Sequence, residues 1–339
     1  MKTIFVALGV LAFVISPKAA AEDMPLLRYA IGSEDTHSLS QLPTEVAQRK
    51  KLFDREGVHV EFVRNSASNS RAAAEGYNPS IERGGPADMT RVSAGYFIHA
   101  VLKGSDAVIV ATQTNNPVYS IIAAPEIRTF ADLKGKVIAL TSPWDTITLT
   151  SRKLLAMHGL GANDFQVEGS IRGSESRFAC MKSGRCAANS AGHPSDIHAI
   201  EAGYHRLGTT NEIGPVIYDV EIVRRDWAQT HKDTVVRYIR AVADAMRFIN
   251  DRGNRDEVEK ITAELTREPQ GVVKEMLAAY YDPGLRVLPR QGEVDMTSFS
   301  YLLQVLKEAG VYDRPLPPAE RFVDLSYAQA AGIHSAPAP

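Results

Sequence analysis

Short hydrophobic blocks alternate with amphipathic stretches along this chain, and the two kinds of block predict strands and helices in turn. Apolar runs such as Val137 to Leu140 are short enough to be buried parallel strands. Strands are predicted over residues 26–31, 58–63, 87–92, 107–112, 118–123, 137–140, 165–171, 185–191, 204–208 and 216–223, and helices over 42–53, 65–75, 93–102, 146–159, 175–182, 197–203, 230–249, 258–265, 272–281 and 296–310. This succession favours an α/β fold with mostly parallel sheets flanked by helices.

Polar residues mark the start of two predicted helices. Thr230-His231-Lys232-Asp233 has the Ser/Thr-x-x-acid spacing of a helix cap, which predicts the start of the longest helix there. The other start, Thr141 to Thr146, follows a buried strand and is rich in hydroxyl groups. Unpaired backbone N–H groups at such a start can bind a carboxylate, sulfonate, phosphate or polar heterocycle. No nucleophile, metal cluster or glycine-rich cradle accompanies it, so the sequence favours a site that holds a ligand without changing it.

The first 21 residues have the pattern of a secretory signal peptide. Lys2 precedes an apolar run from Ile4 to Ile15, Pro17 interrupts it, and three alanines precede a cleavage point ahead of Glu22. A retained membrane anchor is the alternative, but that would need about 20 apolar residues. Because no cysteine lies near the cleavage point to carry a lipid, we expect a protein that is free in the periplasm.

Length and charge limit the possible classes of protein. A chain of 339 residues exceeds the size at which one core keeps growing, so we expect two lobes. The formal net charge is −2, whereas binding of nucleic acid would need a clustered basic surface. We therefore expect no nucleic-acid partner, and a monomer. The Pro/Ala-rich end, residues 331–339, is predicted to be loose.

The two cysteines, Cys180 and Cys186, leave two interpretations open. In an exported chain they can form a local disulfide, because the compartment is oxidising. They can equally be two buried thiols that act as small apolar side chains. Two sulfurs do not make a metal site, and His193 and His198 complete no standard ligand spacing, so no metal is expected.

Three segments carry a resemblance to a known family. They are LPTEVA at 42–47, LFDREGVHVEFV at 52–63 and FADLKGKVIAL at 130–140. In this order they resemble the substrate-binding proteins of ABC transporters, in the branch for aliphatic sulfonates, taurine, nitrate and thiamine precursors (NMT1/THI5-like). The chain departs from that pattern at Thr90 and Arg91, in a strand that the family usually keeps apolar.

The resemblance implies a two-lobed periplasmic-binding-protein fold of type II-like topology with two hinge crossovers. These would fall near Thr112 to Val118 and Asn211 to Tyr218. Lobe one would then comprise residues 24–112 and 219–330, and lobe two residues 113–218. The implied function is the solute-binding component of an ABC importer, which closes over a small organic anion or polar heterocycle and delivers it to a membrane permease. No cofactor is implied.

In such a fold the cleft is lined by loops that follow the carboxyl ends of strands. The residues of this chain that match such positions are Ser40, Gln41, Arg91, Ser93, Tyr96, Asn115, Ser142, Trp144, Thr146, Asn189, His193 and Tyr218. Arg91 needs an anionic partner, which is either the ligand or a structural acid such as Asp88 or Asp145. Trp144 either stacks on a flat ligand or is buried between the lobes. Ser40 and Gln41 could equally cap a helix.

Two other functions compete with transport. Related two-lobed folds include a pyrimidine synthase and decarboxylases of aromatic acids, so the chain could be an enzyme that acts on an aromatic acid or pyrimidine. The synthase needs a cysteine-rich iron motif that two cysteines cannot supply, and no metal or acid–base pair for decarboxylation can be assembled from the motifs. We therefore predict that the protein is not an enzyme. A sensor that presents its ligand to a membrane kinase is the third possibility.

Overall fold

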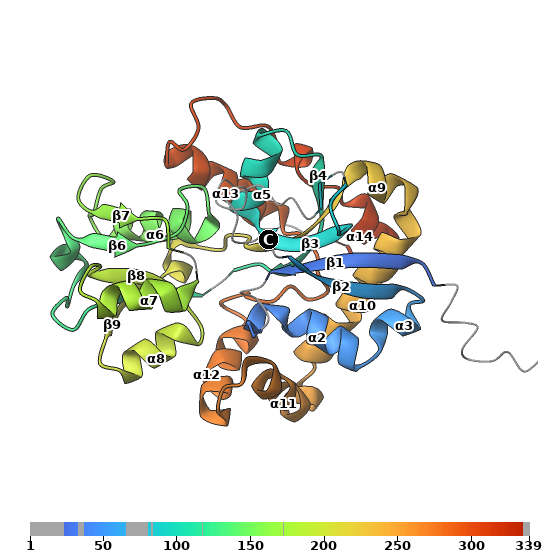
Figure 1. Ribbon diagram of the computed structural model, residues 1–339, viewed down its shortest axis with the longest axis horizontal. Helices are drawn as coiled ribbons and strands as arrows, with labels where there is room; N and C mark the ends of the chain where they lie inside the picture. Colours follow the sequence, from blue (N-terminus) through green and yellow to red (C-terminus); the bar gives the residue numbers. More distant parts are fainter. Residues whose placement is uncertain are drawn as a thin grey trace, which may run out of the picture.

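The computed structural model describes residues 24–32, 37–65, 81–82, 84–116, 118–171 and 173–334, and in Figure 1 these form two lobes side by side. The predicted signal peptide, residues 66–75 of the predicted helix over 65–75 and the end of the tail from residue 335 lie outside these ranges, and residue 65 belongs to a strand. Within the described ranges the strands form two five-stranded sheets, one in each lobe, in the orders β2-β1-β3-β10-β4 and β7-β6-β8-β5-β9.

The sheet of lobe one is mostly parallel, with one strand reversed. Its strands are β1 (Leu26–Gly32), β2 (His59–Asn65), β3 (Met89–Ser93), β4 (Ala107–Thr114) and β10 (Asp219–Arg224). β1 runs parallel to both β2 and β3, whereas β10 is antiparallel to both β3 and β4. The reversed strand is therefore the one that enters from lobe two.

Lobe two repeats this arrangement on a smaller scale. Its strands are β5 (Tyr119–Ala123), β6 (Val137–Ala139), β7 (Gln166–Glu168), β8 (Ala188–Gly192) and β9 (His205–Thr209). β6 is parallel to β7 and β8, and β5 is antiparallel to β8 and β9. Here the reversed strand, β5, follows the chain's first passage between the lobes.

Helices cover both faces of each sheet. Those of lobe one are α2 (Leu42–Arg49), α3 (Leu52–Arg55), α5 (Ala94–Leu102), α9 (Arg225–Thr230), α10 (Lys232–Asn250), α11 (Arg255–Thr266), α12 (Gln270–Tyr281), α13 (Met296–Glu308) and α14 (Ser326–Ala330), and those of lobe two are α6 (Thr146–Met157), α7 (Ser174–Lys182) and α8 (Ser195–Glu201). Single turns are η1 (Leu39–Gln41), η3 (Phe130–Leu133), η4 (Thr210–Ile213), η5 (Arg252–Asn254) and η6 (Ala319–Arg321). In β1, Leu27 and Tyr29 pack with α10 in one core, whereas Ala30 belongs to the core on the other face.

The lobes meet along α5, α6 and α13 as well as at the two chain passages. Phe97 of α5, Leu149 of α6 and Leu302 of α13 are all buried in one apolar cluster that contains residues of both lobes. At the rim, the Lys153 ammonium lies 2.5 Å from the Glu308 carboxylate. The two lobes thus share a continuous hydrophobic contact on one side.

All ten predicted strands are present, shifted at their ends by no more than a few residues. Two expectations about helices are wrong. The predicted helix 42–53 is two helices, because Lys51 adopts a left-handed φ of 54° between them. The predicted cap at Thr230 does not form, because Thr230 is the last residue of α9 and its hydroxyl donates to the Trp227 carbonyl at 2.9 Å. His231 precedes α10 without a side-chain cap.

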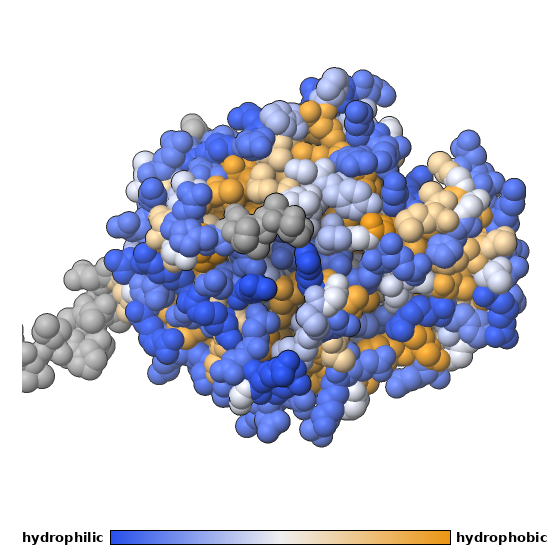
Figure 2. Space-filling model, turned by 180° about the vertical axis from the view of Figure 1, so that it is seen from behind, coloured by the Kyte–Doolittle hydropathy of each residue, from blue (hydrophilic) through white to orange (hydrophobic). Residues whose placement is uncertain are grey.

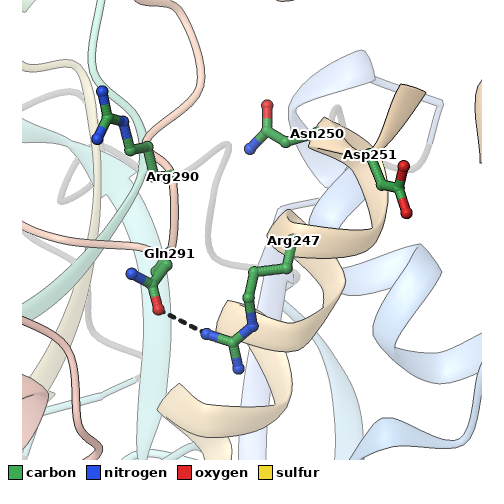
Figure 3. A pocket seen from close by; sticks show the side chains of 5 residues that line it. All are labelled: Arg247, Asn250, Asp251, Arg290 and Gln291. Carbon is green, nitrogen blue, oxygen red and sulfur yellow. Dashed lines mark hydrogen bonds between the residues drawn. The ribbon is translucent and has the colours of Figure 1, made fainter. Parts of the chain in front are cut away.

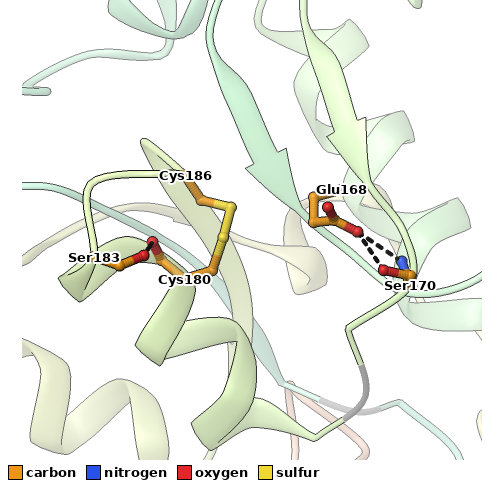
Figure 4. The surroundings of a disulfide bond; sticks show 5 residues. All are labelled: Glu168, Ser170, Cys180, Ser183 and Cys186. Atoms are coloured by element: carbon orange, nitrogen blue, oxygen red, sulfur yellow. Dashed lines mark hydrogen bonds between the residues drawn. A yellow bond between two sulfur atoms is a disulfide. The ribbon is translucent and has the colours of Figure 1, made fainter.

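A disulfide joins Cys180 and Cys186. Of the two interpretations that the sequence left open, the structure therefore shows the bonded pair and not two free thiols. The Cα atoms are 5.4 Å apart, and the bond ties the end of α7 to the segment that leads into β8 (Figure 4). Both residues are 2% exposed and belong to the apolar cluster under α7 and α8. Such a bond is typical of a protein that folds in an oxidising compartment.

We expect this disulfide to stabilise the folded protein by about 2 kcal/mol, because it restricts a short loop of the unfolded chain. Thermal unfolding with and without reductant measures the effect. Reductant should lower the Tm of the wild type, but not that of a Cys180→Ala/Cys186→Ala double variant. Equal sensitivity of the two proteins would contradict the bond.

Candidate functional site

The starts of helices α5 and α6 face each other across the boundary between the lobes. The Ser93 hydroxyl donates to the Asp145 carboxylate at 2.8 Å and lies 3.1 Å from the Thr146 hydroxyl. The Gly95 backbone N–H donates to the same Thr146 hydroxyl at 3.0 Å. The sequence predicted Ser93 and Thr146 as ligand-binding residues, and the structure joins them directly to each other.

Gly95 makes this close approach possible. A Cβ atom at residue 95 would lie 2.1 Å from the Trp144 carbonyl oxygen and 2.8 Å from the Thr146 backbone nitrogen. Real Cβ atoms do not come so near to backbone atoms, so only glycine allows the two lobes this contact. In the sequence, Gly95 is only one of the residues of the predicted helix over 93–102.

Asp145 occupies the centre of this contact. Its side chain, 3% exposed, accepts a hydrogen bond from the Ile147 backbone N–H at 3.4 Å and so caps α6. Burial raises the pKa of this carboxyl, and the hydroxyls of Thr141 and Ser93 oppose the shift. The chain's own carboxylate thus caps the helix start at which the sequence predicted an anion-binding corner.

Aromatic side chains cover the rest of the turn. Trp144 stacks on His99 of α5 with ring centroids 4.0 Å apart, and the His99 ring lies 2.7 Å from the Tyr312 hydroxyl. The Tyr96 hydroxyl donates to the Ser142 hydroxyl at 3.1 Å. Trp144 is half-buried at this boundary, and its contact with a ligand stays a prediction. We call the whole contact between the starts of α5 and α6 the seam. Its residues are Ser93, Gly95, Tyr96, His99, Ser142, Trp144, Asp145 and Thr146.

Arg91 is paired with an acid of its own chain. Its guanidinium is 3.5 Å from the Asp219 carboxylate, and the side chain is only 5% exposed. It also donates to the carbonyl of Ser40, whose hydroxyl lies 2.8 Å from that of Ser38. Asp219 is a structural acid that the sequence did not single out. Gln41 is buried and precedes α2 without a capping hydrogen bond from its side chain.

Three tyrosines gather near Asp219, where the chain passes between the lobes. The hydroxyls of Tyr119 and Tyr218 are 2.9 Å apart, and Tyr280 comes from α12. Burial raises the pKa of all three phenols, and the Asp219 carboxylate adds to each shift. Each nevertheless keeps part of its surface exposed.

Arg177 supplies a second positive charge on the side of lobe two. Its side chain is 2% exposed, and its guanidinium donates to the Ser190 carbonyl at 2.9 Å and to the Ser174 hydroxyl at 3.1 Å. Its positive charge lowers the pKa of Asp145 and of Tyr119, and so acts against the upward effect of burial. Arg177, the three tyrosines, Arg91 and the two acids Asp145 and Asp219 form the group that we call the junction. Its residues are Arg91, Tyr119, Asp145, Arg177, Tyr218, Asp219 and Tyr280.

The other three candidates lie in different surroundings. The backbone N–H of Asn115 donates to the Val287 carbonyl at 2.8 Å, and its side-chain oxygen is buried without a hydrogen bond. Asn189 is 0% exposed and shares a sheet face with apolar neighbours that pack under α7 and α8. Its amide has no hydrogen-bond partner. The His193 ring lies 2.7 Å from the carboxylate of Asp196. Ligand contact by these residues stays a prediction.

A separate surface depression lies at the end of α10. Its lining is Arg247, Asn250, Asp251, Arg290 and Gln291 (Figure 3). The Arg247 guanidinium donates to the Gln291 amide oxygen at 2.6 Å. None of the predicted ligand-binding residues belongs to it. Across the described ranges, no group of three His, Cys, Asp or Glu side chains is placed to hold a metal ion.

Comparison with known proteins identifies the fold first. The alkanesulfonate-binding protein SsuA of Xanthomonas axonopodis, solved with MOPS, matches with a TM-score of 0.70 and 18% identity over 88% of this chain and 98% of its own. The nitrate-binding protein NrtA of Synechocystis matches with 0.70 and 14% identity over 91% and 89%. The desulfurization enzyme DszB matches with 0.62 and 12% identity over 91% and 98%. The fold is that of the two-lobed periplasmic binding proteins, as the sequence predicted.

The family follows from the sequence itself. The model of the NMT1-like family matches residues 38–263, which is more than half of the chain, so the protein belongs to that family. The resemblance found in the three sequence segments is thereby confirmed. The comparison with curated protein sequences found no match.

Proposed function

We propose that this protein is the solute-binding component of an ABC importer, which holds a small ligand between its lobes and delivers it to a membrane permease. Membership of the NMT1-like family and the shared fold of sulfonate- and nitrate-binding proteins support this function. The observation that carries it is the junction, where Tyr119 and Tyr218 of lobe two, with hydroxyls 2.9 Å apart, adjoin the pair of Arg91 and Asp219 in lobe one.

Closure of the lobes gives the mechanism. We propose hinges at the two chain passages, with lobe one comprising residues 24–112 and 219–330 and lobe two residues 113–218. A ligand that contacts both lobes binds the closed form better and so shifts the population towards it. The seam then contributes to closure, because Ser93 and Gly95 of lobe one bond to Asp145 and Thr146 of lobe two.

We propose a periplasmic location for the mature chain. The apolar leader in the sequence and the disulfide both agree with export to an oxidising compartment. Among the described helices, none has the length and apolar character needed to cross a bilayer. The face of the molecule in Figure 2 is mostly hydrophilic, with hydrophobic residues showing in smaller patches.

An enzyme is the second candidate, because the desulfurization enzyme DszB has the same fold. Turnover of an aromatic acid or a pyrimidine by the purified chain, followed by release of product, would favour it. Binding of such a compound without product would favour transport. The binding function takes precedence here because the family and most of the similar structures are binding proteins.

Tryptophan fluorescence tests ligand-driven closure. The chain has two tryptophans: Trp144 lies in the seam, and Trp227 stacks on His231 within lobe one with centroids 4.3 Å apart. We expect a ligand to change the fluorescence of the wild type and of Trp227→Phe, but not that of Trp144→Phe. Thermal shift against a panel of small anions, uncharged rings and amines identifies the ligand. If none of them stabilises the folded protein, the proposed function loses its support.

A further inference from the structure

The lobes also meet on the side away from α5 and α13. In Figure 1, α8 of lobe two and α12 of lobe one lie below the sheets, whereas α5 and α13 lie above them. Ile197 of α8 is 3% exposed and belongs to the apolar cluster of lobe one, together with Leu265 of α11 and Val272 of α12. This part of lobe two therefore packs on lobe one.

His198, the next residue of α8, forms a polar bridge at this contact. Its Nε2 atom lies 3.0 Å from the carboxylate of Glu268, which belongs to the turn between α11 and α12 in lobe one. Its Nδ1 atom lies 3.4 Å from the carboxylate of Glu201, at the end of α8 itself. The His198 side chain is 43% exposed and that of Glu268 18%, so protons from the solvent reach the ring. The imidazole thus lies between two acids, one from each lobe.

Only the protonated ring can make both contacts as hydrogen bonds. A carboxylate accepts without donating, and a neutral imidazole carries one N–H, whereas the charged imidazolium carries two. Burial acts to lower the pKa of His198, but the hydrogen bonds and charges of Glu268 and Glu201 outweigh it, so that pKa is raised. The lobes in this arrangement therefore favour the charged ring.

Other charged side chains of these two segments have different surroundings. Asp196 of α8 is fully buried and pairs with Arg206 at 3.0 Å within lobe two. Arg267 precedes Glu268 and is exposed to water. The charged groups bonded to His198 are therefore Glu268 and Glu201.

A second ion pair between the lobes provides a comparison. Lys153 of α6 lies 2.5 Å from Glu308 of α13, beside the apolar contact on the other side. A hydrogen bond from Glu308 raises the pKa of Lys153, so this lysine stays charged through the neutral range. Of these two pairs, only that of His198 changes its charge near neutral pH.

We propose that His198 and Glu268 form a pH-dependent latch between the lobes, in which protonation of His198 favours the closed form and deprotonation favours opening and release of the ligand. The part that concerns release rests on the proposed binding function, whereas the latch itself needs no ligand. It is complete below about pH 6.5 and is lost as pH rises through the raised pKa of His198. Because the pair is partly exposed, we expect about a threefold change in the ratio of closed to open molecules.

An NMR titration of the histidine rings tests the pair in solution. We expect the pKa of His198 to fall in Glu268→Gln, because the largest upward effect on it is removed. The control is Glu257→Gln, which changes an acid of α11 that pairs with Lys50 at 2.9 Å, and it should leave the pKa of His198 unchanged. If Glu268→Gln also leaves it unchanged, the two side chains do not meet in solution and the latch is ruled out.

Distances between spin labels measure closure without a ligand. The native cysteines are joined in the disulfide, so labels can be attached at Glu175→Cys in α7 and Lys274→Cys in α12, both at exposed positions. We expect the ratio of the short-distance to the long-distance population to be about threefold higher at about pH 5.5 than at about pH 8.5. In His198→Gln and in Glu268→Gln we expect the same ratio at both pH values.

The matched control for this measurement is His158→Gln. His158 lies 3.1 Å from Glu212 and is also partly exposed, but both residues belong to lobe two, so the wild-type response to pH should remain. A wild-type ratio that does not change with pH, or a change that persists in His198→Gln, would overturn the latch and leave the binding function standing. If the ratio behaves as expected but no compound stabilises the protein, the latch stands and the binding function falls.

Discussion

Replacing Gly95 with alanine is expected to lower the Tm of this protein by about 6 °C and to open its lobes. The added Cβ would lie 2.1 Å from the Trp144 carbonyl oxygen, and backbone atoms on both sides cannot rotate away from it. Overpacking of this kind costs on the order of 3 kcal/mol, and a chain of this size loses roughly 2 °C per kcal/mol. Differential scanning calorimetry measures the first effect, and an increased radius of gyration in small-angle X-ray scattering measures the second.

The chain offers a closely matched control. Gly271 is the second residue of α12, as Gly95 is the second residue of α5, but a Cβ there meets nothing within 4 Å. Gly271→Ala should leave both the Tm and the radius of gyration at wild-type values, or raise the Tm slightly, because alanine favours a helix. If Gly95→Ala behaves like Gly271→Ala, the seam does not hold the lobes together in solution.

The second large effect concerns Glu221 and pH. Burial raises the pKa of this carboxyl from about 4.5 to about 7, although Arg91 and the hydroxyls of Tyr29 and Tyr238 oppose the shift. The Gln113 amide from β4 also donates to it, and that amide in turn bonds to Thr44 of α2. The folded protein therefore binds this proton more tightly than the unfolded chain does. Its contribution to stability is complete below about pH 4.5 and is lost as pH rises to about 7.

We expect this one group to remove about 3 kcal/mol of stability between pH 4.5 and 7. Glu221→Gln keeps the shape and the hydrogen bonds without the proton equilibrium. We expect the free energy of unfolding of this variant, measured in urea at several pH values, to stay constant where that of the wild type falls. At pH 8 the variant should therefore be more stable than the wild type. The control Glu264→Gln alters an exposed acid whose pKa is lowered, so the decline should remain. A decline that persists in Glu221→Gln would place its origin elsewhere.

Much of the fold was readable because its signals are local. Runs such as Val137 to Leu140 are apolar, short and bounded by turn residues, and each proved to be a strand. The errors have local causes as well. The Thr230 hydroxyl can bond to the end of α9 or cap the start of α10. The sequence alone does not show that it donates to a carbonyl of α9. Nothing in the residue type of Lys51 indicates a left-handed backbone.

The candidate site was only partly readable, because its geometry depends on contacts far apart in the sequence. Ser93 and Thr146 were both predicted to line the cleft, and the structure places their hydroxyls 3.1 Å apart, whereas their contact with a ligand stays a prediction. Arg177, Asp219 and Tyr280 were missed, because each looks like an ordinary helix or strand residue until the lobes come together. One signal was available: Tyr119 and Tyr218 each stand beside a predicted crossover.

The place of β10 in its sheet has a consequence for how the chain folds as it is made. β10 lies between β3 and β4, yet it is produced only after the whole of lobe two. Until residue 224 has been synthesised, β4 has no neighbouring strand among those that the structure describes in its sheet. Lobe two, by contrast, is complete in one continuous stretch and can form first. Assembly of the larger lobe must therefore wait for the smaller one, and a fragment that stops before β10 would leave an unpaired strand edge open to aggregation.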